Sequence, residues 1–188
     1  MYIASQKRKD NIAEYLLYMW QIEDIIRANS LDIEKIKKNV IDRFTDLTDD
    51  QRREMTQWYE SLIDMMRTEG VAEKGHLQLN KNTLAQLVEL HQALLQDPRF
   101  PAYSAEFYKT LPYIVELRSR AGNNAVGEIE TCFTALYGML MLRLQSKEIS
   151  PETLNAVNQI SRMIAMLAHH FKVDKDEIEK AALEREGN

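Results

Sequence analysis

Three polar residues near the start of the chain have the spacing of a binding face. Glu14, Tyr18 and Gln21 lie four and three positions apart, which places them on one side of a helix. The remaining surface of that helix is strongly apolar, and an unpaired charge inside a bundle costs several kcal/mol. We therefore expect the Glu14 carboxylate to lie partly inside the protein, paired with an arginine from another helix.

Arg118 is the first candidate for that partner, ahead of Arg143 and Arg162. It precedes a turn where Arg120 and Asn123 offer further donors, which suit an anionic ligand as well as a carboxylate. Two interpretations stay open: a structural ion pair that fixes helix register, and a polar pocket that binds a small molecule. The candidate ligand-binding residues are Glu14, Tyr18, Gln21, Arg118, Arg120 and Asn123.

The other reactive side chains do not form a recognisable catalytic or metal site. A carboxylate-bridged di-metal bundle needs two Glu-x-x-His pairs, and only Glu73 and His76 have that spacing, across Gly75 in an expected loop. His91 falls on the apolar face of its helix and Cys132 is mid-helix, so both are expected in the core. The sequence contains no G-x-S-x-G, P-loop or H-E-x-x-H motif. We expect no metal, no cofactor and no catalytic residues.

The charge of the chain indicates which partners are disfavoured, and its cysteine content indicates the cellular compartment. The chain of 188 residues has 24 Lys and Arg against 29 Asp and Glu, a formal charge of -5, which disfavours nucleic acid and anionic membranes as partners. A single cysteine excludes an intramolecular disulfide and fits a reducing compartment. No segment resembles a signal peptide or a membrane span. These features predict a cytoplasmic protein.

Apolar residues recur at helical spacing along the whole chain, which predicts an all-α fold. We expect a single-domain bundle of six or seven helices over residues 1–188, with the N-terminal helix central and residues 174–188 as a loosely held helix or tail. Pro112 should kink or interrupt its helix. The expected helices cover about 6–28, 33–45, 49–69, 80–96, 103–121, 125–147 and 151–171.

Two functions are compatible with this sequence. The absence of a catalytic constellation and the surplus of apolar helix surface favour a non-catalytic interaction protein that forms a homodimer. The alternative is a small-molecule-binding or enzymatic bundle that uses the polar cluster around Glu14, Tyr18, Gln21 and an arginine.

The N-terminal segment also resembles a known family. Residues 3–27 read IASQKRKDNIAEYLLYMWQIEDIIR, which is similar to the start of an uncharacterised bacterial family of all-helical proteins of about this length. The likeness extends along the whole chain. That resemblance implies a helical fold and a cytoplasmic location, and it supplies no catalytic residues, because the family has none assigned.

Overall fold

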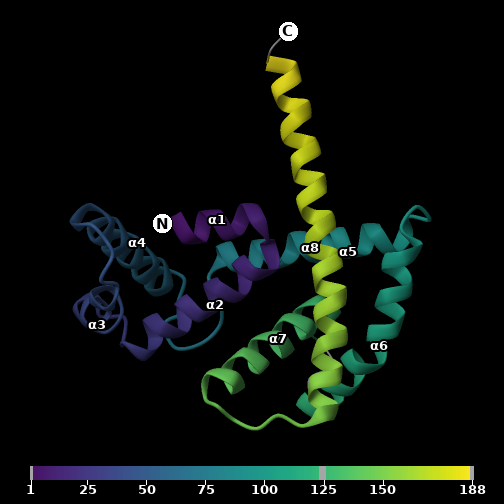
Figure 1. Cartoon of the computed structure of the whole chain (residues 1–188), viewed down its shortest axis with the longest axis horizontal. Coiled ribbons are helices and arrows are strands. Elements are labelled where there is room, and N and C mark those ends of the chain that lie inside the picture. Colours follow the sequence, from purple (N-terminus) through teal and green to yellow (C-terminus); the bar gives the residue numbers. More distant parts are fainter. Residues whose placement is uncertain (1, 123–125, 187–188) are drawn as a thin grey trace.

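The computed structural model describes residues 2–122 and 126–186, and the side chains of residues 3–122 and 126–175. The described chain is helical and contains no strand, which confirms the all-α prediction. It has eight α-helices and one short 3-10 helix where six or seven helices were expected (Figure 1). They are α1 (Tyr2–Asp10), α2 (Ile12–Ala28), α3 (Ile33–Asn39), η1 (Ile41–Arg43), α4 (Asp49–Thr68), α5 (Gln78–Gln96), α6 (Pro101–Ala121), α7 (Glu128–Leu144) and α8 (Pro151–Glu186).

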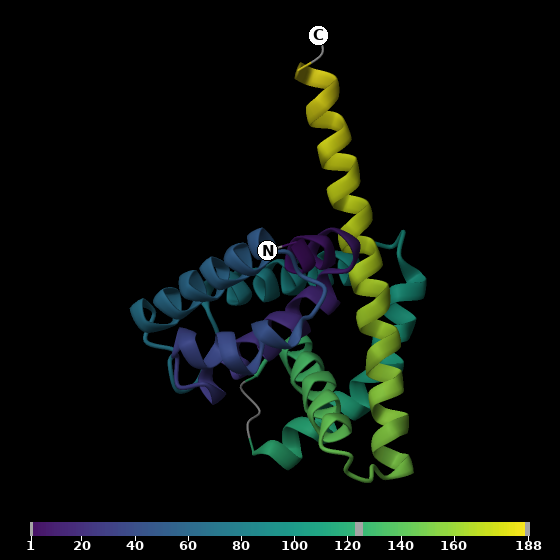
Figure 2. The same cartoon turned by 60° about the vertical axis from the view of Figure 1, so that its left-hand side comes forward.

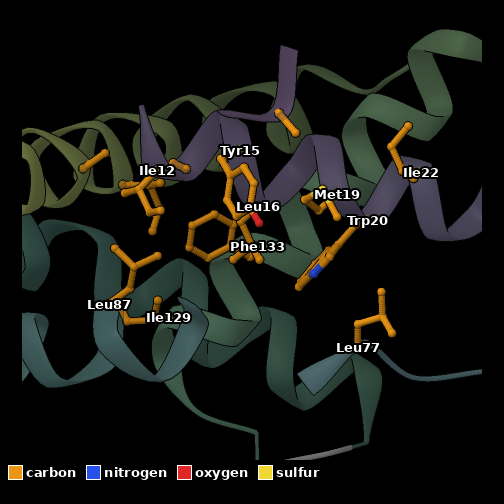
Figure 3. Close-up of a cluster of buried hydrophobic side chains, with 14 of the residues drawn as sticks. Ile12, Tyr15, Leu16, Met19, Trp20, Ile22, Leu77, Leu87, Ile129 and Phe133 are labelled. Carbon is orange, nitrogen blue, oxygen red and sulfur yellow. The ribbon is translucent and has the colours of Figure 1, made fainter. Parts of the chain in front are cut away.

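Helix α2 packs against α1, α5, α7 and α8. Side chains from Leu16, Met19 and Trp20 face Leu87 of α5 and Phe133 of α7 in the apolar core (Figure 3). Half of the helix is buried because apolar residues cover most of its circumference. The residues of α2 therefore reach several neighbouring helices at once, and this helix positions the polar site described below.

The predicted first helix over residues 6–28 is wrong, because the chain divides it at Asn11. The Asn11 side chain accepts hydrogen bonds from the N–H groups of Ala13, at 3.0 Å, and Glu14, at 3.2 Å. Asn11 is thus an N-cap, which starts α2 as a new helix with its own direction.

Most other boundaries follow local signals. The capping box of Thr48 and Gln51 starts α4 as predicted, and Pro151 is the first residue of α8. Helix α6 is not interrupted at Pro112, although its axis bends along its length (Figure 1). The predicted α7 start near residue 125 is wrong, because Gly127 is its N-cap.

Helix α8 also differs from the prediction at its C-terminal end. It runs unbroken for 36 residues, so no separate helix begins after Asp174. The polar segment after Phe171 offers little apolar surface for packing, and this end of α8 projects from the other helices in both views (Figures 1 and 2).

Candidate functional site

The predicted cluster around Glu14 does not form. The Glu14 side chain is 60% exposed, and its carboxylate pairs with Lys7 Nζ at 3.1 Å. The division at Asn11 explains this partner, because it brings α1 back alongside the first turn of α2. The prediction that Glu14 is partly buried against an arginine is therefore wrong.

The predicted arginines pair with other residues than Glu14, whereas Tyr18 and Gln21 follow it on the same face of α2. Tyr18 and Gln21 are half-buried on α2, and burial raises the pKa of the Tyr18 phenol. Arg118 pairs instead with Glu128 at 3.3 Å and with the carbonyl of Val126. Arg120 pairs with Glu116 at 2.5 Å on the same helix, and Asn123 falls outside the described residues.

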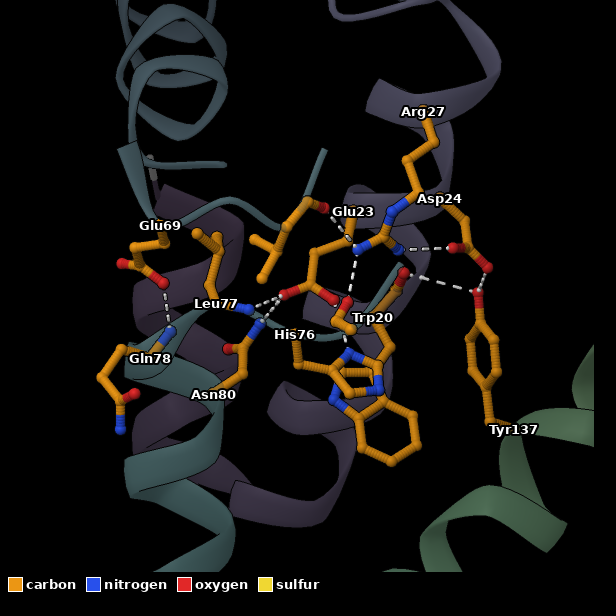
Figure 4. A network of polar contacts seen from close by, with 12 residues as sticks. Trp20, Glu23, Asp24, Arg27, Glu69, His76, Leu77, Gln78, Asn80 and Tyr137 are labelled. Atoms are coloured by element: carbon orange, nitrogen blue, oxygen red, sulfur yellow. Dashed lines mark hydrogen bonds and ion pairs between the residues drawn. The ribbon is translucent and has the colours of Figure 1, made fainter. Parts of the chain in front are cut away.

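The buried acid of α2 is Glu23, which is fully inaccessible to solvent. One of its oxygens accepts from the backbone N–H of Leu77 at 2.8 Å and from Asn80 Nδ2 at 2.7 Å. The other lies 2.6 Å from His76 Nδ1 (Figure 4). A buried carboxylate needs such partners to offset its desolvation. Glu23 therefore joins α2 to the start of α5 through three donors.

Further along the same face of α2, Arg27 holds the loop that precedes His76. Its guanidinium donates to the carbonyls of Val71, at 3.2 Å, and Gly75, and to Asp24 at 2.9 Å (Figure 4). Gly75 has a φ of +87°, a left-handed conformation in which other residues are strained. The loop from 71 to 76 is thus fixed by side chains of α2, and His76 has a defined place.

Tyr137 extends this network to α7. Its hydroxyl donates to Asp24 Oδ2 at 2.5 Å. Burial, followed by this hydrogen bond to Asp24, raises the pKa of the Tyr137 phenol, so the hydroxyl keeps its proton at neutral pH. The network therefore links α2, α5 and α7 around one region of the molecule.

His76 faces an open groove of about 600 Å³ between α5 and α7. Its ring stacks on the Trp20 indole with 4.2 Å between ring centroids and 14° between the planes (Figure 4). Apolar side chains of α5, from Leu84, Ala85 and Val88, continue the surface beside Trp20. A volume of this size, with an apolar wall and few polar groups, is typical of small-molecule sites.

Charged residues lie around this apolar wall. Lys81 and Glu89 come from α5 and Glu130 comes from α7, and all three are exposed. Asn80 also lines the groove. Its Nδ2 donates to Glu23, which fixes the orientation of the amide, and its buried Oδ1 has no hydrogen-bond partner among the residues that the structure describes. A buried acceptor without a donor costs about 1–3 kcal/mol, and such costs are more often found at functional sites than in a routine core.

The hydrogen bond to Glu23 determines how His76 meets the groove. A carboxylate accepts hydrogen bonds, so the tautomer that suits this contact carries its proton on Nδ1 of the His76 imidazole. In that tautomer of the neutral ring, Nε2 has no proton, is directed away from Glu23, and can accept a hydrogen bond. The arrangement presents one fixed acceptor beside an apolar surface.

Sequence reasoning missed Glu23 although a signal for it exists. Residues 12, 16, 19, 23 and 26 alternate by four and three, and the other four are isoleucine, leucine, methionine and isoleucine. A glutamate in the middle of such a stripe must be buried with partners. The spacing of His76 indicates only Glu73 as a partner, in a metal site, whereas its observed partner is Glu23, 53 residues away in sequence.

His91 and Cys132 occupy the core as predicted. His91 is buried on α5, where its Nδ1 lies 2.7 Å from the Tyr103 hydroxyl, and burial lowers its pKa. Cys132 is a buried free thiol whose pKa burial raises to about 12. Among residues 3–122 and 126–175, no group of three or more His, Cys, Asp and Glu side chains is arranged to hold a metal ion.

The fold and site define an all-helical protein with a stacked tryptophan and histidine at an open groove. The chain belongs to the family described as a domain of unknown function, DUF4924, whose model matches residues 1–178. This match confirms the resemblance drawn from the N-terminal segment. Comparison with curated proteins and with solved structures finds no match. No helix in the described part of the chain is long and apolar enough to cross a membrane.

Proposed function

We propose that this protein binds a small molecule in the groove between α5 and α7. The observation that carries the proposal is the fixed His76 imidazole. It stacks on Trp20, is held by the buried Glu23, and lies at the edge of the open groove of about 600 Å³. A site that fixes its polar group before the ligand arrives loses less entropy on binding.

Binding fits this groove better than nucleophilic catalysis. None of the described lining residues is serine, threonine or cysteine, so no hydroxyl or thiol nucleophile adjoins His76. We also propose that the protein is cytoplasmic and of bacterial origin.

A fragment screen with a blocked variant tests this function. Ala85 is exposed on the wall of the groove, so Ala85→Trp should fill the cavity without disturbing the core. Ala165→Trp, on the exposed face of α8, is the matched control. Ligand-observed NMR should find fragments that bind the wild type and the control but not the blocked variant. Fragments that bind all three proteins equally, or no binding at millimolar concentration, would argue against the proposal.

Self-association is a second candidate, favoured by a specific surface. Tyr108 and Val115 are exposed large apolar residues seven positions apart on α6, which places them on one face. Exposed apolar surface of this kind is found at contacts between proteins. We propose a homodimer through this face.

Sedimentation velocity at micromolar concentration tests the dimer. The wild type should have twice the chain mass of 21.9 kDa. A Tyr108→Glu and Val115→Glu double variant should have the monomer mass. A monomeric wild type would contradict this second candidate and leave the groove proposal unaffected.

A further inference from the structure

We infer that the ligand of the groove is an amine with an apolar, flat body, protonated at neutral pH. The inference rests on the proposed function and assigns the chemical class of the bound molecule. It follows from the charges around the groove, from the orientation of His76 and from the shape of the apolar wall.

The charged groups favour a cation. Glu89 and Glu130 stand on opposite walls of the groove, on α5 and α7, and Lys81 is the one cation among the described residues that line it. The formal sum of these three charges is negative. Complementary charge across a binding surface selects the partner and repels a ligand of the opposite kind.

The hydrogen-bonding groups point to the same class. In the neutral tautomer whose Nδ1–H donates to Glu23, Nε2 of His76 accepts a hydrogen bond from the ligand. The carboxylates of Glu89 and Glu130 only accept as well. An ammonium group has three donors and no acceptor, so it matches these three acceptors, whereas a carboxylate ligand brings only acceptors and has Lys81 as its one cationic partner in the lining.

The wall explains the apolar body. Leu84 and Val88 are four positions apart on α5 and half-buried, with Ala85 between them, which makes a low apolar strip next to the Trp20 indole. A short side chain at position 85 leaves room for a flat group to lie along the helix. Burial of an aromatic ring on such a surface supplies most of the affinity, and the amine sets the orientation.

Isothermal titration calorimetry with three probes of one skeleton tests the class. The probes are 2-phenylethylamine, 2-phenylethanol and 3-phenylpropionate, which are cationic, neutral and anionic at pH 7.5. The amine should bind at least about tenfold more tightly than the carboxylate, with the alcohol between them. Glu130→Gln should weaken the amine about threefold and leave the alcohol unchanged. Glu54→Gln, an exposed acid on α4, is the matched control and should change neither.

The outcomes separate the two proposals. Tighter binding of the carboxylate, removed by Ala85→Trp, would overturn the amine assignment while supporting the groove as a binding site. Equal affinity for all three probes with the same sensitivity to Ala85→Trp would also overturn the assignment. Amine binding that persists in Ala85→Trp, or no binding of any probe at millimolar concentration, would contradict both.

Discussion

Helix α2 carries two glutamates nine positions apart whose surroundings are opposite. Glu14 is 60% exposed and meets one flexible lysine, whereas Glu23 is fully buried and meets three donors from the segment before and within α5. A surface pair contributes at most about 1 kcal/mol because water solvates both partners. A buried carboxylate loses that solvation, so its fixed partners decide whether the region folds. The position of an acid relative to the apolar stripe, rather than its presence on an apolar helix, determines its role.

Alanine at the two glutamates should separate these regions most strongly. Glu23→Ala strands the Leu77 N–H and the Asn80 amide in the core, so we expect a loss of about 3 kcal/mol in the free energy of unfolding. Glu14→Ala removes one exposed ion pair, with Lys7, and should change the free energy of unfolding by less than about 0.5 kcal/mol. Urea titration followed by circular dichroism measures both. Equal losses would contradict the comparison.

Arg27 tests whether the buried region depends on its loop. Arg27→Met keeps the apolar stem but leaves the carbonyls of Val71 and Gly75 without this donor, which should cost about 2 kcal/mol. Cleavage of the 71–76 loop by a protease should also become faster. Arg53→Met, which breaks an exposed pair with Asp50, is the control and should leave both properties unchanged. An intact loop in Arg27→Met would show that α2 does not hold it.

His91 should have a smaller effect on the free energy of unfolding, and the direction of its pH dependence can be worked out. Burial lowers its folded-state pKa below the ordinary value of 6.5, so below about pH 6.5 the unfolded state binds a proton that the folded state does not. The stability from neutral His91 is fully present above pH 6.5 and falls as the pH drops toward the folded pKa. Between pH 7 and 5.5 the wild type should lose more of its free energy of unfolding than His91→Gln. Parallel pH profiles of the two proteins would contradict this reading.

Cys132 should react least, because its thiol is closed off from reagents in the native protein. Its thiol is buried, and burial raises its pKa to about 12, so almost no thiolate exists at pH 8. The native protein should react with a disulfide reagent only at the rate of unfolding, and the urea-unfolded chain should react at once. Rapid labelling of the native protein would place Cys132 outside the core.

Local signals explain which parts of the structure could be predicted. The capping box at Thr48, the proline at position 151 and the apolar face of His91 each act within one helix, and the structure confirms them. The signal for the division at Asn11 is also local, since Asn11 caps α2, but the apolar pattern continues on both sides and predicts one helix. Glu23 and His76 are different, because their contact depends on how a loop 53 residues away folds back onto α2. No spacing in the sequence specifies that return.

The central claim is that Glu23 holds His76 with Nε2 free for a ligand in the groove. Long-range ¹H–¹⁵N correlation spectra of the imidazole nitrogens at pH 8, assigned with His76→Gln, test it directly. We predict that Nδ1 of His76 carries the proton and that Nε2 does not, with Glu23→Gln changing this pattern and Glu14→Gln leaving it intact. A proton on Nε2 with Nδ1 free, or a spectrum indifferent to Glu23→Gln, would contradict the account.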